Sequence, residues 1–334
     1  MKATGLVLIL LALSAPARAA SDPVDVGAAK AEGSVRWYTS TPVATAQNIA
    51  NLFEKETGIK VELFRSGGSA VLSRFMQELN AGAIQTDVLT TSDPAAATTL
   101  AERGIFVAFK PANFEKIPAE VKDERGYWIA QRLNLLAIAL KGDAVKAADR
   151  PKTWSDLTDP KYKGLEVMPD PSFTSLQLVA VGTLAKKFGW EFYEKLKRND
   201  VMIVQGHQQV EDMVKRGERP IAAEELDSYA DDDRRAGHDI VTIYPSEGVF
   251  AIASPTAIVK GGPHPNAAKL FAAFMIGDSV QNAFAQEGIY AARIDTPAPS
   301  GSPALQSLKL MQIDFAALAQ DEGEVKSRFN EIFQ

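Results

Sequence analysis

The chain of 334 residues carries 36 lysines and arginines against 42 aspartates and glutamates, which gives a formal net charge of −6. Because the basic residues are scattered along an acidic chain, the composition argues against nucleic acid as a partner. The chain contains no cysteine, which excludes disulfide bonds and thiolate metal sites. Its length exceeds what one hydrophobic core usually serves and indicates two domains.

An export signal is predicted over residues 1–19. Lys2 supplies the positive start, residues 5–14 are apolar but too few to span a bilayer, and Ala17-Arg18-Ala19 fits a small-x-small cleavage site. A bacterial lipoprotein needs a cysteine just after its signal, and the chain has none. We therefore expect the signal to be cleaved and the protein to be released into the periplasm without a lipid anchor.

The chain then repeats a unit of strand, short Ser/Thr/Gly turn and helix. The first unit has a strand over residues 34–38, a turn over 39–42 and a helix that stops at Gly58. The second has a strand over residues 60–65, the turn Ser66-Gly67-Gly68-Ser69 and a helix with one apolar face. Each turn therefore follows the carboxyl end of a strand and precedes a helix start.

Two more units of this kind follow. Residues 86–90 are predicted as a strand, and the next helix begins with a cap and a proline at residues 91–94. Residues 164–168 are a further strand, followed by a turn over 169–175 and another helix. This alternation predicts an α/β fold with open, mostly parallel sheets flanked by helices.

Two longer β-rich runs, residues 129–140 and 249–260, have no turn directly after them. We interpret them as paired hinge strands that carry the chain between two lobes. On this interpretation residues 20–131 and 256–334 form a discontinuous first lobe, and residues 132–255 form the second. The ligand cleft would lie between the lobes.

Five segments resemble the extracellular solute-binding proteins of the ferric-iron and 2-aminoethylphosphonate type. They are VRWYTSTPVATAQNIANLFEKETGIKVELFRSGGSAVLSRFMQEL, TDVLTTSD, PKTWSDLTDPKYKGLEVMPDP, VKRGERPIAAEE and IASPTAIVKGGPHPNAAKLFAAFM. The resemblance covers nearly the whole chain after the signal. It implies a two-lobed type II periplasmic-binding-protein fold, and the delivery of a small-molecule solute to an ABC permease and its ATPase at the inner membrane.

The ferric members of this family usually carry adjacent tyrosines just after a GE-x-P-I segment, because phenolate oxygens are hard ligands that suit Fe(III). Here residues 223–229 read AEELDSY and contain one tyrosine. The stretch is more similar to that of members that bind phosphonates, phosphorylated sugars or other small organic solutes. We therefore expect a small anionic or zwitterionic organic solute of that kind.

The turns after the strands supply most of the candidate ligand contacts. Helix starts present free backbone N–H groups there, so hydroxyls and glycines at these places can surround an anion without any arginine. The alternative is that these hydroxyls only cap helices. The candidates are Ser40, Thr41, Ser66, Gly67, Gly68, Ser69, Ser92, Ser172, Thr174 and Ser175. A Gly68→Val change is expected to block the approach of the anion to the backbone.

Two further candidates face them from the other lobe. His207 follows an apolar strand and could donate to a phosphoryl oxygen, while Glu225 could hold an ammonium group or a sugar hydroxyl. For His207 the alternative is an exposed loop histidine.

Ferric iron is the alternative ligand, with Tyr38, His207, Glu225 and Tyr229 as possible ligands. Enzymatic activity is not expected, because the chain has neither a G-x-S-x-G nor an H-E-x-x-H motif, nor a cysteine nucleophile. We expect a monomer without a cofactor.

Overall fold

The computed structural model describes residues 21–334, so the predicted signal over residues 1–19 lies outside the described residues. The chain forms an α/β fold, as predicted. Its strands are β1 (Ser34–Thr39), β2 (Lys60–Arg65), β3 (Val88–Thr90), β4 (Phe106–Val107), β5 (Ile129–Lys141), β6 (Glu166–Pro169), β7 (Met202–Val204), β8 (Ile221–Leu226), β9 (Ile240–Ile243), β10 (Phe250–Val259) and β11 (Tyr290–Ala291).

The helices flank this sheet. They are α1 (Val26–Glu32), α2 (Val43–Thr57), α3 (Gly68–Asn80), α4 (Pro94–Glu102), α5 (Ser175–Phe188), α6 (Glu191–Arg198), α7 (His207–Arg216), α8 (Asp227–Arg235), α9 (Pro265–Met275), α10 (Asp278–Gln286) and α11 (Phe315–Phe333). Short 3₁₀-helices are η1 (Phe114–Lys116), η2 (Ala119–Val121), η3 (Ala147–Asp149), η4 (Ser155–Thr158), η5 (Pro160–Tyr162) and η6 (Leu305–Ser307).

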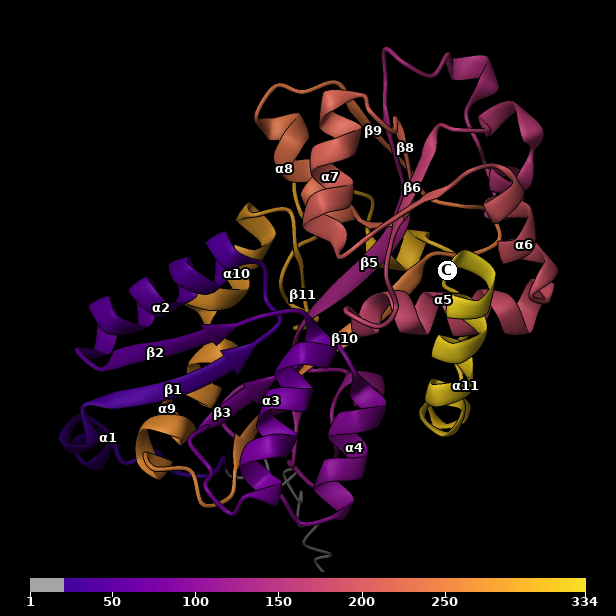
Figure 1. Ribbon diagram of the computed structural model, residues 1–334. Helices are drawn as coiled ribbons and strands as arrows, with labels where there is room; N and C mark the ends of the chain where they lie inside the picture. Colours follow the sequence, from indigo (N-terminus) through magenta and orange to yellow (C-terminus); the bar gives the residue numbers. More distant parts are fainter. Residues whose placement is uncertain (1–20) are drawn as a thin grey trace, which may run out of the picture.

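The sheet consists of two parallel halves joined by two long antiparallel strands. Its hydrogen-bonded order is β2-β1-β3-β10-β5-β8-β6-β7. Strand β1 pairs in parallel with β2 and β3, and β6 pairs in parallel with β7 and β8. Strands β5 and β10 run antiparallel through the middle (Figure 1). The prediction of two lobes joined by paired hinge strands is therefore confirmed.

Local sequence sets where the helices at the cleft begin and end. The carboxylate of Asp93 accepts a hydrogen bond from the N–H of Ala96 at 2.9 Å, and Pro94 occupies the first turn of α4. Helix α2 ends at Gly58, whose φ of 77° lets its N–H bond to the carbonyl of Glu54. Both boundaries agree with the sequence signals.

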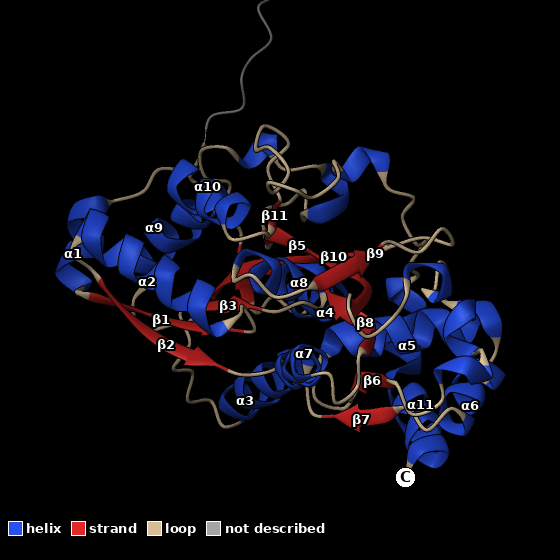
Figure 2. Ribbon diagram, turned by 90° about the horizontal axis from the view of Figure 1, so that it is seen from above, coloured by secondary structure: helices blue, strands red, loops and turns tan. Residues whose placement is uncertain are grey.

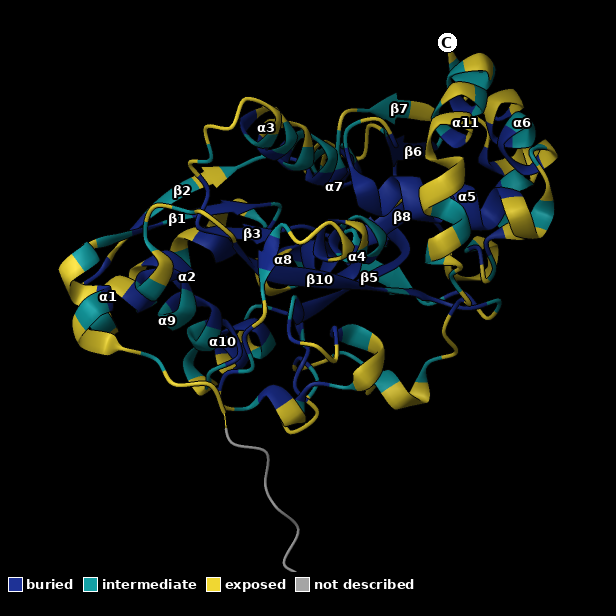
Figure 3. Ribbon diagram, turned by 90° about the horizontal axis from the view of Figure 1, so that it is seen from below, coloured by how far each residue is buried: buried dark blue, intermediate teal, exposed yellow. Residues whose placement is uncertain are grey.

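Each half of the sheet has its own hydrophobic core. In the first half, α2, α9 and α10 cover one face of the sheet, and α3 and α4 cover the other. The ring of Phe271 in α9 packs 5.2 Å from Trp37 and 4.9 Å from Phe53, measured between centroids. Figure 2 shows the strands between layers of helices. Figure 3 shows that the central strands β5, β8 and β10 are buried, while the outer surfaces of α1 and α11 are exposed.

The C-terminal helix α11 packs against α5 and α6 of the second half (Figure 1). The rings of Tyr193 in α6 and Phe329 in α11 lie 6.0 Å apart. The first turns of α11 also meet α4 of the first half. The division into residues 20–131 with 256–334 and residues 132–255 stays a prediction, and α11 lies against helices of the segment that this division places in the other lobe.

None of the helices formed by residues 21–334 combines the length and the apolar character that a membrane crossing requires.

Candidate functional site

A cavity lies where the two halves of the sheet face each other. It receives Ser40 and Ser92, which follow β1 and β3, and Arg65, which ends β2. From the opposite side it receives Phe173 and Leu226. The cavity has about 170 Å³ of space for the centres of water molecules. It therefore lies at the carboxyl ends of the parallel strands, where open α/β sheets bind small ligands.

Three helices begin at the cavity wall. Helices α3, α5 and α7 have Gly67, Thr174 and Gly206 as their N-caps, and none of the three caps forms a side-chain hydrogen bond to its helix. The backbone N–H groups of these first turns are therefore left to another acceptor. Helix N-termini also carry partial positive charge, so their convergence favours an anion.

Two buried side chains at these helix starts have polar atoms without a partner. Ser175 is 2% exposed and its Oγ has no hydrogen bond, while His207 is 6% exposed and its Nε2 has none. Both residues line the cavity. A buried polar atom without a partner is costly, so both atoms are candidates for bonding to a group in the cavity.

Two arginines also line the cavity, which corrects the expectation that an anion would be held without any arginine. The guanidinium of Arg132 is buried, and its Nη1 donates to Oγ1 of Thr41 at 2.8 Å. Arg65 donates from Nε to the backbone oxygen of Thr41 at 2.9 Å. Within residues 21–334, neither guanidinium forms an ion pair with a carboxylate.

Burial of Arg132 has a clear electrostatic consequence. Burial, together with the positive charge of nearby Arg65, lowers the pKa of Arg132 to about 9. The group still carries its charge at neutral pH, in surroundings that do not compensate it. A bound anion would provide the missing compensation.

A chain of hydroxyl groups lines the hinge side of the cavity. Oγ of Ser40 lies 3.2 Å from Oγ of Ser92, which lies 3.3 Å from Oγ of Ser254. The side-chain amide of Asn134 in β5 donates to Ser254 Oγ at 2.8 Å. This chain joins the first half of the sheet to both hinge strands and leaves Ser40, Ser92 and Asn134 at the cavity wall.

The sequence was also compared with protein families. The profile of the bacterial extracellular solute-binding proteins matches residues 85–320. The chain belongs to this family.

Two relatives show what this solute-binding protein is similar to. It is 25% identical over 268 residues to Iron uptake protein A1 of Synechocystis sp.. This match covers 75% of this chain and 73% of that protein. It is 24% identical over 166 residues to the probable ABC transporter periplasmic-binding protein y4fP of Sinorhizobium fredii, a match that covers 47% and 46%.

Two solved structures share its fold. The periplasmic binding protein AfuA from Actinobacillus pleuropneumoniae, solved with fructose-6-phosphate bound, matches with a TM-score of 0.80 at 22% identity and covers 90% of this chain and 98% of its own. Iron-bound HitA from Pseudomonas aeruginosa matches with a TM-score of 0.76 at 22% identity, covering 90% and 99%. The predicted periplasmic-binding-protein fold is confirmed.

The solute-binding protein brings most of the predicted contact residues to the cavity wall. Those that line it are Ser40, Gly67, Gly68, Ser92, Thr174, Ser175, His207 and Tyr229. Those that do not line it are Tyr38, Thr41, Ser66, Ser69, Ser172 and Glu225. His207 is a buried cavity residue, so the alternative of an exposed loop histidine is wrong. Which lining residues touch the solute stays a prediction.

Thr41 holds the arginines in place instead of facing the cavity. Its side chain is fully buried, and its Oγ1 accepts hydrogen bonds from Arg132 and, at 3.2 Å, from the amide of Gln131. It does not cap α2, because the N-cap of that helix is Pro42. The local reason is that Thr39 and Thr41 bond to each other, Oγ1 to Oγ1, at 2.8 Å.

Glu225 faces away from the cavity because β8 contains a bulge. Ala137 of β5 pairs with Glu225 and Ala139 with Ala222, so Ala223 and Glu224 together oppose one residue. Glu224 adopts a φ of 63° at this point. The bulge leaves Leu226 at the cavity wall and directs Glu225 to Nδ1 of His207, at 3.1 Å.

The four residues predicted as ferric ligands do not gather at one place. The hydroxyl of Tyr38 donates to Glu78 at 2.7 Å, away from the cavity. Tyr229 lines the cavity, and burial raises its pKa to about 12, which disfavours the phenolate. Residues 21–334 contain no group of three or more histidine and acidic side chains placed to hold a metal ion.

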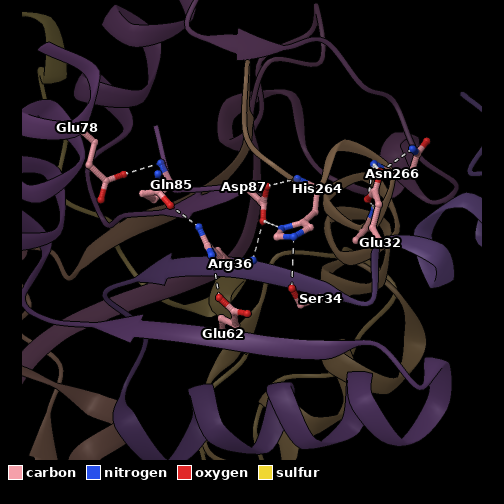
Figure 4. Close-up of polar contacts among 10 residues, drawn as sticks. Glu32, Ser34, Arg36, Glu62, Glu78, Gln85, Asp87, His264 and Asn266 are labelled. Carbon is pink, nitrogen blue, oxygen red and sulfur yellow. Dashed lines mark hydrogen bonds and ion pairs between the residues drawn. The ribbon is translucent and has the colours of Figure 1, made fainter. Parts of the chain in front are cut away.

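A second polar cluster lies at the opposite ends of β1 and β3 (Figure 4). Asp87 accepts hydrogen bonds from Nδ1 of His264 at 2.8 Å and from the backbone N–H of Arg36 at 2.8 Å. Nε2 of His264 lies 3.4 Å from Oγ of Ser34. The same carboxylate also accepts the backbone N–H of His264, so the cluster ties the start of α9 to the sheet.

Proposed function

We propose that this protein is the periplasmic solute-binding component of an ABC importer and that it captures a small anionic or zwitterionic organic solute of the phosphonate or sugar-phosphate kind. The observation that carries the proposal is the buried guanidinium of Arg132, which faces the cavity beside Arg65 without a carboxylate partner. The starts of α5 and α7 on the opposite side, and the start of α3 beside Arg65, supply further donors. The likeness to AfuA, solved with fructose-6-phosphate, and to y4fP supports it.

Capture proceeds by closure of the two lobes around the solute. A ligand that contacts Arg132 from the hinge and Ser175 from the second half binds the closed form more tightly than the open one, and so shifts the population toward it. The closed form is then recognised by the permease and its ATPase. Cleavage of the signal, release into the periplasm and a monomeric state belong to the same proposal, as does binding without chemical turnover.

Replacing Gly67 with alanine should hinder this closure. A Cβ on Gly67 would lie 2.7 Å from the backbone oxygen of Phe173 across the cavity, although the φ of −61° at Gly67 suits any residue. We expect at least about tenfold weaker binding of fructose 6-phosphate by calorimetry, equivalent to about 1.4 kcal/mol. The melting temperature of the ligand-free protein should change little, because the backbone is not strained.

The matched control is Gly323→Ala in α11, where an added Cβ meets nothing within 4 Å. Equal affinity of the Gly67→Ala variant and this control for fructose 6-phosphate would contradict the proposal that the lobes close with Gly67 against Phe173. Gly68→Val would also hinder closure, because a Cβ on Gly68 would clash with Oγ of Ser175. The change therefore acts on the contact between the lobes and not only on the approach of the anion to the backbone. The paired glycines therefore serve the contact between the lobes as well as access to the backbone.

The ligand class is tested by thermal shift and calorimetry on protein that has been unfolded, stripped of ligand and refolded. The probes are fructose 6-phosphate, inorganic phosphate, 2-aminoethylphosphonate and glucose. At a concentration one hundred times its Kd, a cognate ligand stabilises the fold by about 2.7 kcal/mol, which raises the melting temperature by roughly 5 °C. A shift with glucose alone, or with none of the probes, would contradict an organophosphorus anion as the solute.

Ferric iron is the second candidate, supported by the likeness to Iron uptake protein A1 and to iron-bound HitA, and by Tyr229 and His207 at the cavity wall. Ferric citrate should then give the red colour of phenolate-to-iron charge transfer. The anion proposal predicts a colourless protein.

A further inference from the structure

The wall of the cavity carries fixed charge of one sign. Arg65 and Arg132 line it, and none of the described residues that line it is an aspartate or a glutamate. A solute in this cavity therefore meets two guanidinium groups and no carboxylate. The charge on the wall therefore favours anionic solutes over cationic ones.

The two guanidinium groups are held close together by one residue. Thr41 accepts Nη1 of Arg132 on its hydroxyl at 2.8 Å and Nε of Arg65 on its backbone oxygen at 2.9 Å. Two like charges fixed in this way repel each other, and both side chains line the cavity. One negative charge compensates one of them, and two negative charges compensate both.

The two glutamates of β8 do not line the cavity and bond to other groups, although Oε2 of Glu225 has no hydrogen-bond partner. Oε1 of Glu225 faces His207 at 3.1 Å and accepts the backbone N–H of Leu226 at 2.7 Å. Glu224 accepts the hydroxyl of Tyr193 at 2.9 Å and the side-chain amide of Gln177. Both glutamates are at least 98% buried, since Glu224 is 1% exposed and Glu225 is 2% exposed. An ammonium group in the cavity would therefore find no counter-charge at its wall.

The rest of the wall is uncharged and combines apolar side chains, such as Phe173 and Leu176, with polar ones. Gln205, Gln208 and Gln209 contribute amides from the start of α7, and Asn134 and Ser40 contribute an amide and a hydroxyl from the other side. Such groups bind hydroxyls and carbonyls without favouring either sign of charge. They fit the uncharged part of a solute whose anionic group lies at the arginines.

We propose that the site selects organic dianions that carry no ammonium group, and that Arg65 and Arg132, clamped together by Thr41, are the residues that make this selection. This rests on the proposed function and narrows it, because the zwitterionic solutes are excluded. The chemical class is a phosphate monoester, or another dianion of similar size, on a neutral hydroxylated or short carbon skeleton.

Two pairs of probes that differ only at one group test the selection by calorimetry at neutral pH. They are glucose 6-phosphate against glucosamine 6-phosphate, and ethyl phosphate against phosphoethanolamine. In each pair of which at least one member binds, we expect the member without an ammonium group to bind at least about tenfold more tightly than the other. Equal or tighter binding of the ammonium members would overturn the selection and leave the proposed function standing. Binding of none of the four would overturn the selection, and the absence of a thermal shift with every probe used for the proposed function would contradict both.

Substitutions separate the roles of the two arginines and of Thr41. Arg65→Gln removes one of the two charges from a half-buried position, and should reduce the preference for the dianion about tenfold. Thr41→Val removes the hydroxyl that holds Arg132 and should weaken the preference, whereas Thr41→Ser should retain it. The control is Arg36→Gln, which alters an ion pair with Glu62 outside the cavity. An unchanged preference in Arg65→Gln would overturn the proposal, as would equal effects of Thr41→Val and Thr41→Ser.

Discussion

Replacing Arg132 with glutamine should weaken binding of the anionic solute by roughly a hundredfold or more while raising the melting temperature of the ligand-free protein. Loss of a buried charge that pairs with a ligand costs about 3 kcal/mol or more of binding free energy. In the ligand-free protein the same guanidinium is buried without a carboxylate, so its removal relieves a desolvation cost on the order of 1 kcal/mol. Calorimetry and thermal melts measure the two effects.

In Arg132→Gln the affinity should fall while the melting temperature of the ligand-free protein rises, and this combination distinguishes a ligand-binding residue from a structural one. A residue that only maintains the fold would lower stability and affinity together. Thr41 keeps a partner in the variant, because the amide of Gln131 also donates to its Oγ1 at 3.2 Å. Arg36→Gln again serves as the control and should leave the affinity unchanged. Wild-type affinity in Arg132→Gln would remove this residue from the site.

Raising the pH from about 5.5 to about 9 should lower the melting temperature by roughly 5 °C or more. Burial raises the pKa of Glu166 to about 9, that of Asp227 to about 8 and that of Glu224 to about 7. A carboxyl whose pKa is higher in the folded state stabilises the fold fully below its unfolded pKa. That stability is lost as the pH rises through the folded pKa. A loss of a few kcal/mol corresponds to several degrees for a chain of this size.

Acids whose pKa is lowered do not offset this trend. Hydrogen bonds to Arg36 and Arg293 hold the pKa of Glu62 and Asp295 below their ordinary values. These two acids stabilise the fold fully at a pH above their ordinary pKa values. That stability is lost only as the pH falls through their lowered pKa values in the folded protein. Their contributions are therefore constant across the window in which the buried acids lose their protons.

Glu166→Gln tests the origin of the slope. Both carboxyl oxygens of Glu166 are buried without a hydrogen bond, so a neutral amide of the same shape should remove most of its share of the pH dependence. The variant should exceed the wild type in stability at about pH 9 and match it at about pH 5.5. Glu191→Gln, on the exposed side of α6, is the control. Parallel melting curves of Glu166→Gln and the wild type at every pH would contradict this explanation.

The fold could be predicted from the sequence because each of its units is local. Strand, turn and helix follow one another within short segments, and signals such as Asp93 before Pro94 act on neighbouring residues. The hinge strands could be recognised because residues 129–140 form an unbroken β-rich run. The position of α11 could not be predicted, because its packing on α6 depends on contacts between residues more than a hundred positions apart, such as Tyr193 with Phe329.

The site was predicted in part, for a related reason. The hydroxyls and glycines that follow strands could be predicted, because open α/β sheets generally bind their ligands at the carboxyl ends of the strands. Arg132 was missed, although an arginine within a largely apolar run is itself a signal of a buried functional charge. Glu225 was expected at the cavity but faces away from it. The bulge at Glu224 changes which face of the sheet the following side chains of β8 point to, and nothing in the residues Ala223 and Glu224 signals a bulge.

A crystal structure of the protein purified without unfolding, so that its natural solute remains bound, tests the central claim most directly. We expect electron density for a small molecule between the lobes, with an anionic group bonded to Arg65 and Arg132 and also in contact with Ser175 or the start of α7. A cavity that holds only water after saturation with every probe, or a solute that turns a cationic group toward Arg132, would contradict it.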